Sequence, residues 1–154
     1  MTILPRIRTK FGEGIGVQIL ISPPEIDDNN HTFLTTDYAA AVSSLVVDNG
    51  NKFSANDYIV IGQIGSEKAE IVKISTASAT TLTVDTTAFA HNRGERITFI
   101  PYNQIVPERS TDSGVNYSAL STINIRPDST ETFLARTADA STDYYRVRFY
   151  NLTT

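Results

Sequence analysis

An internal repeat constrains the fold of this chain more than any other feature of its sequence. Each copy contains an apolar run of strand length, a polar turn, a phenylalanine, an acidic turn residue and a second apolar run. The copies consist of Ser44–Asp48, Phe53 and Asp57–Ile61, and of Thr81–Asp85, Phe89 and Glu95–Ile100. Neither copy can bury its apolar face by itself. Two related halves that close on each other therefore predict a small pseudo-symmetric β-barrel or sandwich.

Alternation within the repeat predicts which side chains point into the core, because successive residues of a strand face opposite sides. The predicted inward residues are Leu45, Val47, Ile59, Ile61, Leu82, Val84, Ile97 and Phe99. The phenylalanine of each copy is also expected to be buried. The runs Tyr58–Ile61 and Ile71–Ile74 flank a polar loop with Gly62 and Gly65, which predicts a β-hairpin that joins the two halves.

The last apolar run, Asp143–Tyr150, predicts a strand with two different faces. Its inward face carries Tyr145, Val147 and Phe149, and its other face carries Tyr144, Arg146, Arg148 and Tyr150. The second set is the best candidate for a partner-binding surface, because Tyr and Arg are enriched at interface anchors. A solvated edge is the alternative. The strands after Tyr102 make part of a β-sandwich, whose missing edge comes from elsewhere in the chain, such as Val17–Ile21, or from a neighbouring subunit.

The first 16 residues are expected to form an extended arm. Arg6, Arg8 and Lys10 occupy every second position, so their side chains point the same way in an extended chain. An acidic neighbouring surface is the partner that this pattern favours, and a solvated tail is the alternative. The predicted regions are an arm at 1–16, a repeat-containing β-barrel at 17–103 and a partial β-sandwich at 104–154.

Composition argues against several classes of function. The chain of 154 residues has no cysteine and a formal charge of −4, which argues against thiolate chemistry and nucleic-acid binding. No apolar run is long enough to span a membrane. His91 is expected to be a structural turn residue, and Glu67 and Glu70 are expected to serve in loop packing or salt bridges. No catalytic residue, metal site or cofactor is predicted, and an enzyme is not expected.

Four segments of the repeat region carry a resemblance to a known family: Asn56–Gly62, Gly65–Val72, Thr81–Val84 and Phe89–His91. In these segments the chain resembles a β module of virion structural proteins of tailed bacteriophages. Residues 102–154 are similar to a partial fibronectin type III domain, an immunoglobulin-like β-sandwich, with Ser110–Gly114 as a hairpin and Tyr144–Arg148 as the tyrosine-bearing strand.

These resemblances imply a non-enzymatic structural protein that is located in the virion. A capsid decoration or cement protein that stabilises neighbouring subunits is the leading expectation. Its partners would be other virion proteins, first the major capsid protein, and self-association into a homo-oligomer is a further expectation. A tail or neck component and a carbohydrate- or surface-binding module are the alternatives. The last of these requires exposed aromatic side chains that line a groove.

Overall fold

The computed structural model describes residues 6–12, 16–22, 29–129, 132–136, 139–140 and 142–151. Within these ranges the chain forms thirteen β-strands and no helix, which confirms the all-β prediction. None of the described residues therefore forms a helix long and apolar enough to cross a membrane. The chain divides into two compact units. The barrel unit is built from Ile26–Tyr102 and Arg126–Ser129, and the two-sheet unit from Met1–Glu25, Asn103–Ile125 and Thr130–Leu152.

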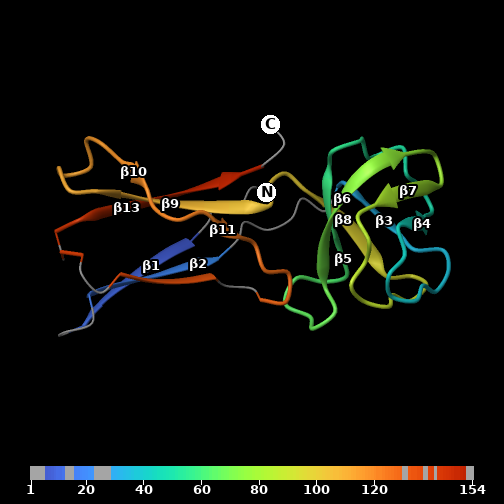
Figure 1. Cartoon of the computed structure of the whole chain (residues 1–154), viewed down its shortest axis with the longest axis horizontal. Coiled ribbons are helices and arrows are strands. Elements are labelled where there is room, and N and C mark those ends of the chain that lie inside the picture. The colour runs from blue at the N-terminus through green and yellow to red at the C-terminus, as the bar shows by residue number, and fades with distance from the viewer. Residues whose placement is uncertain are drawn as a thin grey trace. The chain divides into compact units, whose positions relative to one another are not determined.

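Six antiparallel strands make up the barrel unit (Figure 1). They are β3 (His31–Phe33), β4 (Ser44–Val46), β5 (Tyr58–Ile61), β6 (Glu70–Ala77), β7 (Thr81–Val84) and β8 (Arg96–Ile100). Their order in the sheet is β3-β8-β5-β6-β7-β4. The two ends of this sheet meet at a bridge between Leu34 and Val47. The backbone N–H of Asp48 donates to the carbonyl of Phe33 at 3.1 Å, so the sheet closes into a barrel.

The strand registers give the barrel a pseudo-two-fold axis. Leu45 lies opposite Leu82 in the β4–β7 pair, and Val60 lies opposite Thr98 in the β5–β8 pair. These two pairs of strands lie on opposite sides of the six-strand ring. A two-fold rotation through them exchanges β4 with β7, β5 with β8 and β3 with β6. The predicted repeat is therefore a unit of three strands, of which the sequence pattern identified two.

Backbone hydrogen bonds follow the same two-fold relation. The N–H of Asn56 donates to the carbonyl of Ile74 at 2.8 Å, and the N–H of Gly94 donates to the carbonyl of Leu34 at 2.8 Å. Asn56 and Gly94 also share a positive φ, of 76° and 81°. Across the β4–β7 pair, Val47 N–H donates to Thr80 and Val84 N–H donates to Ser43, each at 2.9 Å. The two halves thus repeat one hydrogen-bonding scheme.

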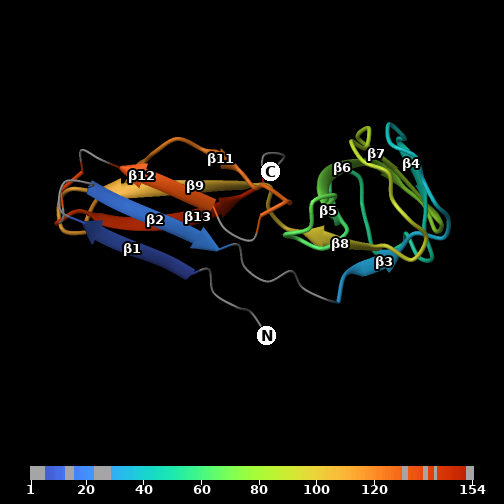
Figure 2. The ribbon, with the colours of Figure 1, turned by 90° about the horizontal axis from the view of Figure 1, so that it is seen from below.

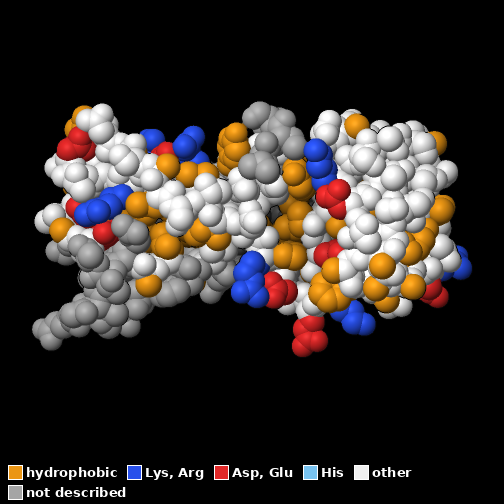
Figure 3. Space-filling view, viewed as in Figure 1, with side chains coloured by type: hydrophobic (Ala, Val, Ile, Leu, Met, Phe, Trp, Pro, Cys, Tyr) orange, Lys and Arg blue, Asp and Glu red, His pale blue; other side chains and the backbone are white. Residues whose placement is uncertain are grey.

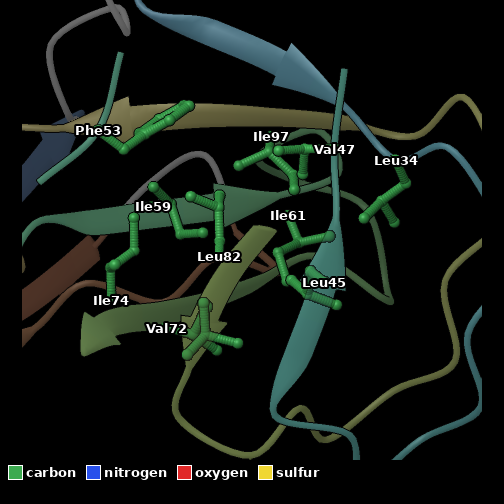
Figure 4. Packing of buried hydrophobic residues seen from close by; sticks show 11 residues of the cluster. Leu34, Leu45, Val47, Phe53, Ile59, Ile61, Val72, Ile74, Leu82 and Ile97 are labelled. Atoms are coloured by element: carbon green, nitrogen blue, oxygen red, sulfur yellow. The ribbon is translucent and has the colours of Figure 1, made fainter. Parts of the chain in front are cut away.

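The barrel core confirms the predicted inward residues (Figure 4). Seven of them are buried, namely Leu45, Val47, Ile59, Ile61, Leu82, Val84 and Ile97, and Phe99 packs partly buried against them. The phenylalanine prediction is correct for Phe53, which is 5% exposed, and wrong for Phe89, which is 38% exposed. His91 is buried in the second half, and it follows Phe53 at the 38-residue spacing that separates Ile97 from Ile59.

Two sheets make up the other unit, and they form two layers in Figures 1 and 2. One sheet contains β1 (Arg6–Gly12), β2 (Gly16–Ser22) and β12 (Thr132–Arg136), in the order β1-β2-β12. In the other sheet, β9 (Gln104–Ser110) pairs with β10 (Ser118–Ala119), β11 (Ile123–Asn124) and β13 (Tyr144–Tyr150). Ile19, Ile21 and Ile105 are fully buried, as expected for side chains between two such layers.

The N-terminal region differs from the prediction of an extended arm at 1–16. Residues 6–12 pair along their whole length with β2, so this part of the expected arm is the first strand of a β-hairpin. Alternation of charged residues with Ile7, Thr9 and Phe11 is a strand pattern, which needs only a neighbouring strand to be satisfied. β2 also pairs with β12. The predicted 17–103 barrel therefore begins too early, and Val17–Ile21 supplies a strand to the two-sheet unit.

Candidate functional site

The two faces of β13 have the composition predicted from the sequence. Tyr144, Arg146, Arg148 and Tyr150 are exposed, whereas Tyr145, Val147 and Phe149 are half-buried. β13 pairs with β9 from Tyr144 opposite Ser110 to Tyr150 opposite Gln104. The structure therefore brings four of the seven predicted partner-binding residues to one side of one strand. The other three, Arg6, Arg8 and Lys10, lie on β1, and their side chains are outside the described part of the structure.

One buried carboxylate holds two arginine side chains on this face. Glu108 lies opposite Arg146 in the β9–β13 pair, and its side chain is only 5% exposed. The Nε atoms of Arg146 and Arg148 both donate to the Glu108 carboxylate, the latter at 2.8 Å. The hydrogen bond from Arg146 is the main reason that the pKa of Glu108 lies below its usual range. Since two cations share one anion, the group carries a net positive charge.

A closely hydrogen-bonded loop lies next to these arginines. The Ser110 hydroxyl donates to Asp112 Oδ1 at 2.6 Å and accepts the backbone N–H of Gly114 at 3.0 Å. Asp112 also accepts hydrogen bonds from the backbone and side chain of Asn116, at 2.9 and 2.7 Å. These bonds, with that from Ser110 the strongest, lower the pKa of Asp112 to about 2. Positive φ values at Ser113 and Gly114 complete the turn, which is therefore held in one conformation.

This loop presents apolar and aromatic side chains beside β13. Val115, in the loop, is 76% exposed, and Tyr144, at the start of β13, is 51% exposed. Gly114 lies against both Tyr117 and Tyr144, so the loop and the strand are in contact. The Arg146 guanidinium lies over the Tyr117 ring at 4.1 Å from its centroid, a cation–π contact. We call Val115, Tyr117, Tyr144, Arg146 and Arg148 the Tyr–Arg surface.

A second ion-pair network lies at the same end of β9. Arg109 contacts Asp139 at 3.1 Å and Asp143 at 2.6 Å, and the Tyr145 hydroxyl donates to Asp139 at 2.7 Å. Desolvation and this hydrogen bond raise the pKa of Tyr145. These groups are largely occupied by one another, since both carboxylates are buried and paired with Arg109. The network therefore fixes the start of β13 and offers little to an external ligand.

The barrel unit contains a buried cluster of ionisable residues, Glu70, His91 and Glu95. His91 Nε2 lies 2.5 Å from Glu70, and its Nδ1 lies 3.1 Å from Glu95. Glu70 also accepts the backbone N–H groups of Ala88 and Phe89, at 2.7 and 3.3 Å. Both ring nitrogens of His91 therefore face carboxylate oxygens, one of Glu70 and one of Glu95. The predicted packing role of Glu70 thus involves His91 as its partner.

Burial makes this cluster a structural feature of the second half of the barrel. The His91 side chain has no exposed surface, and that of Glu70 has very little. The cluster connects the start of β6 to the turn before β8, at the place that Phe53 occupies in the first half. Across the described ranges, no group of three or more His, Cys, Asp or Glu residues is arranged to hold a metal ion.

Exposed hydrophobic residues also occur on the barrel unit, where Figure 3 shows groups of them among mostly uncharged atoms. Phe33, Val46 and Phe89 are the large ones. Phe33 and Val46 lie on neighbouring strands, and their two-fold equivalents, Lys73 and Thr83, are polar. Unlike the Tyr–Arg surface, the set of Phe33, Val46 and Phe89 contains no charged residue.

Sequence comparison adds no family assignment to this geometry. No protein-family model matches the chain, and no curated protein matches it significantly. The sequence pattern identified the exposed face of β13 and the hairpin at Ser110–Gly114, but it did not identify Glu108 or the contact between this loop and β13. The available signal for an acidic partner of the arginines was the position of Glu108 directly after the apolar run Ile105–Pro107, in a strand that is buried over most of its length.

Proposed function

We propose that this chain is a non-enzymatic structural protein of a tailed-phage virion, where it acts as a capsid decoration or cement protein. The resemblance of residues 53–105 to a virion β module suggests the setting. The Tyr–Arg surface is the observation that supports a role in assembly, because exposed tyrosine and arginine side chains on an ordered strand and loop are typical of interface anchors.

The proposed mechanism is attachment by buried area and strand pairing. A decoration protein stabilises a capsid by contacting neighbouring subunits, and its binding free energy comes from the surface that becomes buried between them. β13 can contribute in two ways, through the Tyr–Arg surface and through backbone groups at its edge. The major capsid protein is the proposed partner, and the virion is the proposed location.

The absence of catalysis is part of the same proposal. In the histidine–carboxylate cluster of the barrel unit, the His91 side chain has no exposed surface and that of Glu70 has very little. Glu108, the other buried carboxylate with strong partners, is occupied by Arg146 and Arg148. Both groups already have hydrogen-bonding partners within the chain, and this supports structural roles for them.

Two alternatives use the same residues. A tail or neck component would use the same surface to join a ring of subunits. A carbohydrate-binding module would stack sugar rings on Tyr144 and Tyr150, which are both exposed on β13. Carbohydrate binding predicts that Tyr144→Ala abolishes retention on glycan arrays, whereas attachment to a capsid predicts no retention even for the unmodified chain.

Quantitative mass spectrometry of purified virions tests the proposed function. A copy number close to that of the major capsid protein, or a fixed fraction of it, is the expected result for a decoration protein. A number that matches a single ring would favour the neck or tail instead. Complete absence from purified particles would contradict a virion role. Tyr144→Ala should reduce the copy number, while Phe33→Ala, a change of an exposed aromatic residue in the barrel unit, should leave it unchanged.

A further inference from the structure

We propose that the outer edge of β13 binds an extended acidic segment of a partner protein, which adds to the sheet as a further strand. Its carboxylates would lie beside Arg146 and Arg148. This inference rests on the proposed function and adds to it the chemistry of the partner that β13 binds. Its test uses the isolated full chain, so the two proposals can fail separately.

The sheet topology provides the edge. β9 pairs with β10 and β11 on one side and with β13 on the other. Within the described part of the chain, no strand pairs with Tyr144–Arg148 on the side away from β9. This five-residue segment, Tyr144–Arg148, has no proline and no bulge in its register, so it is a template for strand addition. The barrel unit, by contrast, joins the ends of its sheet.

Charge selects the kind of strand. Arg146 and Arg148 share the single carboxylate of Glu108, and their side chains remain 52% and 57% exposed. A guanidinium has five N–H donors, so each arginine can bind a further carboxylate without leaving Glu108. A partner with carboxylates at this position neutralises the excess positive charge. A basic partner would add like charges beside it.

Strand geometry sets the spacing of those carboxylates. Tyr144, Arg146 and Arg148 lie two residues apart on one face of β13, and Tyr145 and Val147 lie on the other. An added strand presents its own alternate side chains to the same two faces. The segment that fits best therefore has acidic residues at every second position and apolar residues between them. The apolar residues extend the layer formed by Tyr145 and Val147.

A second copy of this chain fits the edge poorly. When two β13 strands align antiparallel over their full length, Arg146 of each lies opposite Arg148 of the other. Like charges directly opposite each other destabilise a strand pair. The proposed occupant is therefore a different protein segment, and Tyr144 with Val115 offers it an apolar contact at one end of the strand.

The test measures the binding of a synthetic eight-residue peptide of alternating Glu and Val, with blocked termini, to the full chain. Amide hydrogen exchange should show new protection in β13. A peptide of alternating Lys and Val is the charge control. A Glu–Val peptide that is N-methylated at alternate residues keeps its charge but cannot form a ladder, so it is the control for strand pairing. We expect both control peptides to bind about tenfold more weakly or worse.

Arg148→Gln is the most informative protein variant, because Glu108 keeps Arg146 and the fold is retained. It should weaken binding of the Glu–Val peptide by about tenfold. Arg126→Gln, which removes an exposed arginine of the barrel unit, should not change this affinity. Equal affinity for the Glu and Lys peptides, or an unchanged affinity in Arg148→Gln, would overturn the proposal. So would concentration-dependent protection of β13 without peptide, which would identify a second copy as the occupant.

The outcomes separate this inference from the proposed function. Specific peptide binding by a chain that is absent from virions supports the acidic-strand site and rejects the virion role. A chain that is abundant in virions but indifferent to both peptides retains the virion role and rejects the acidic-strand site.

Discussion

Both units of this protein are built from antiparallel β-strands, but they differ in whether the edge of the sheet is paired and in where charged side chains lie. The barrel unit joins the ends of its sheet through Leu34 and Val47 and encloses its His91 cluster. The two-sheet unit leaves β13 at the end of the described part of its sheet and places two arginines on its exposed face. In the proposed account, the barrel unit is therefore the scaffold, and the two-sheet unit carries the proposed surface for a partner.

The two halves of the barrel bury different side chains at related positions of the backbone. Related positions keep the same backbone hydrogen bonds, but Phe53 in one half corresponds to the ionisable His91 in the other. An apolar side chain needs only packing, whereas a buried histidine needs partners for both ring nitrogens. Glu70 and Glu95 supply those partners. The symmetry of the backbone therefore permits different side-chain chemistry in the two halves.

The largest predicted effect comes from removing the histidine. His91→Ala removes a fully buried ring and leaves the Glu70 carboxylate without its hydrogen-bonding partner. Truncation of a large buried ring to alanine typically costs about 3–5 kcal/mol in the free energy of unfolding. Urea unfolding followed by tyrosine fluorescence measures the loss. Binding of the Glu–Val peptide should be unchanged at temperatures where the variant is folded. A cost below about 1 kcal/mol would show that the cluster is not a main support of the barrel.

The next prediction compares the stability of the two halves of the barrel. Leu45 and Leu82 are opposite each other and both fully buried, so Leu45→Ala and Leu82→Ala should each destabilise the barrel by about 2–5 kcal/mol. The two losses should be similar, because the two-fold relation gives both residues equivalent surroundings. Ser44→Ala, at an exposed position of the same strand, is the matched control. A large cost at one leucine and none at the other would reject the symmetric account of the core.

A smaller, pH-dependent effect is expected in the two-sheet unit. Because hydrogen bonds from the arginines lower the pKa of Glu108, its ionised form stabilises the fold above the ordinary carboxyl value of 4.5. That contribution is lost as the pH falls below this value and through the folded-state pKa. Urea unfolding from about pH 6 to about pH 3 measures it. Glu108→Gln should reduce the change in the free energy of unfolding with pH, and Glu67→Gln should not. An equal change with pH in the unmodified chain and in both variants would contradict this role of Glu108.

The smallest effect tests the related turns of the barrel. Gly94 and Asn56 occupy two-fold-related positions with positive φ. Gly94→Ala should cost about 1–2 kcal/mol because alanine is strained in this conformation, and nothing else lies close to the position. Gly94→Asn should cost less, since asparagine is already accepted at position 56. Differential scanning calorimetry gives the order, and a higher stability for the alanine variant would contradict it.

Local patterns in the sequence predicted much of this architecture. The alternation around Leu45, Leu82 and Val147 identified the strands, their inward faces and the repeat. These features depend only on residues within one strand, where the side-chain period of two is fixed by backbone geometry. The exposed faces of Tyr144 and Arg146 followed from the same rule.

Features that depend on distant parts of the chain could not be predicted in this way. The pairing of β1 with β2 and of β2 with β12 joins segments with no shared pattern, so residues 6–12 looked like an arm. His91 and Glu70 are brought together by closure of the barrel, which no sequence spacing expresses. The position of Glu108 beneath two arginines depends on the β9–β13 register, which is set by the whole sheet.

Amide hydrogen exchange on the isolated chain and on the chain within purified virions tests the central contrast between a closed barrel and an open β13 edge. The account predicts slow exchange for β5, β6, β7 and β8 in both states. The amides of Tyr144–Arg148 that do not donate to β9 should exchange rapidly in the isolated chain and slowly in the particle. Slow exchange of these amides in the isolated chain, or rapid exchange in both states, would contradict a docking role for this edge.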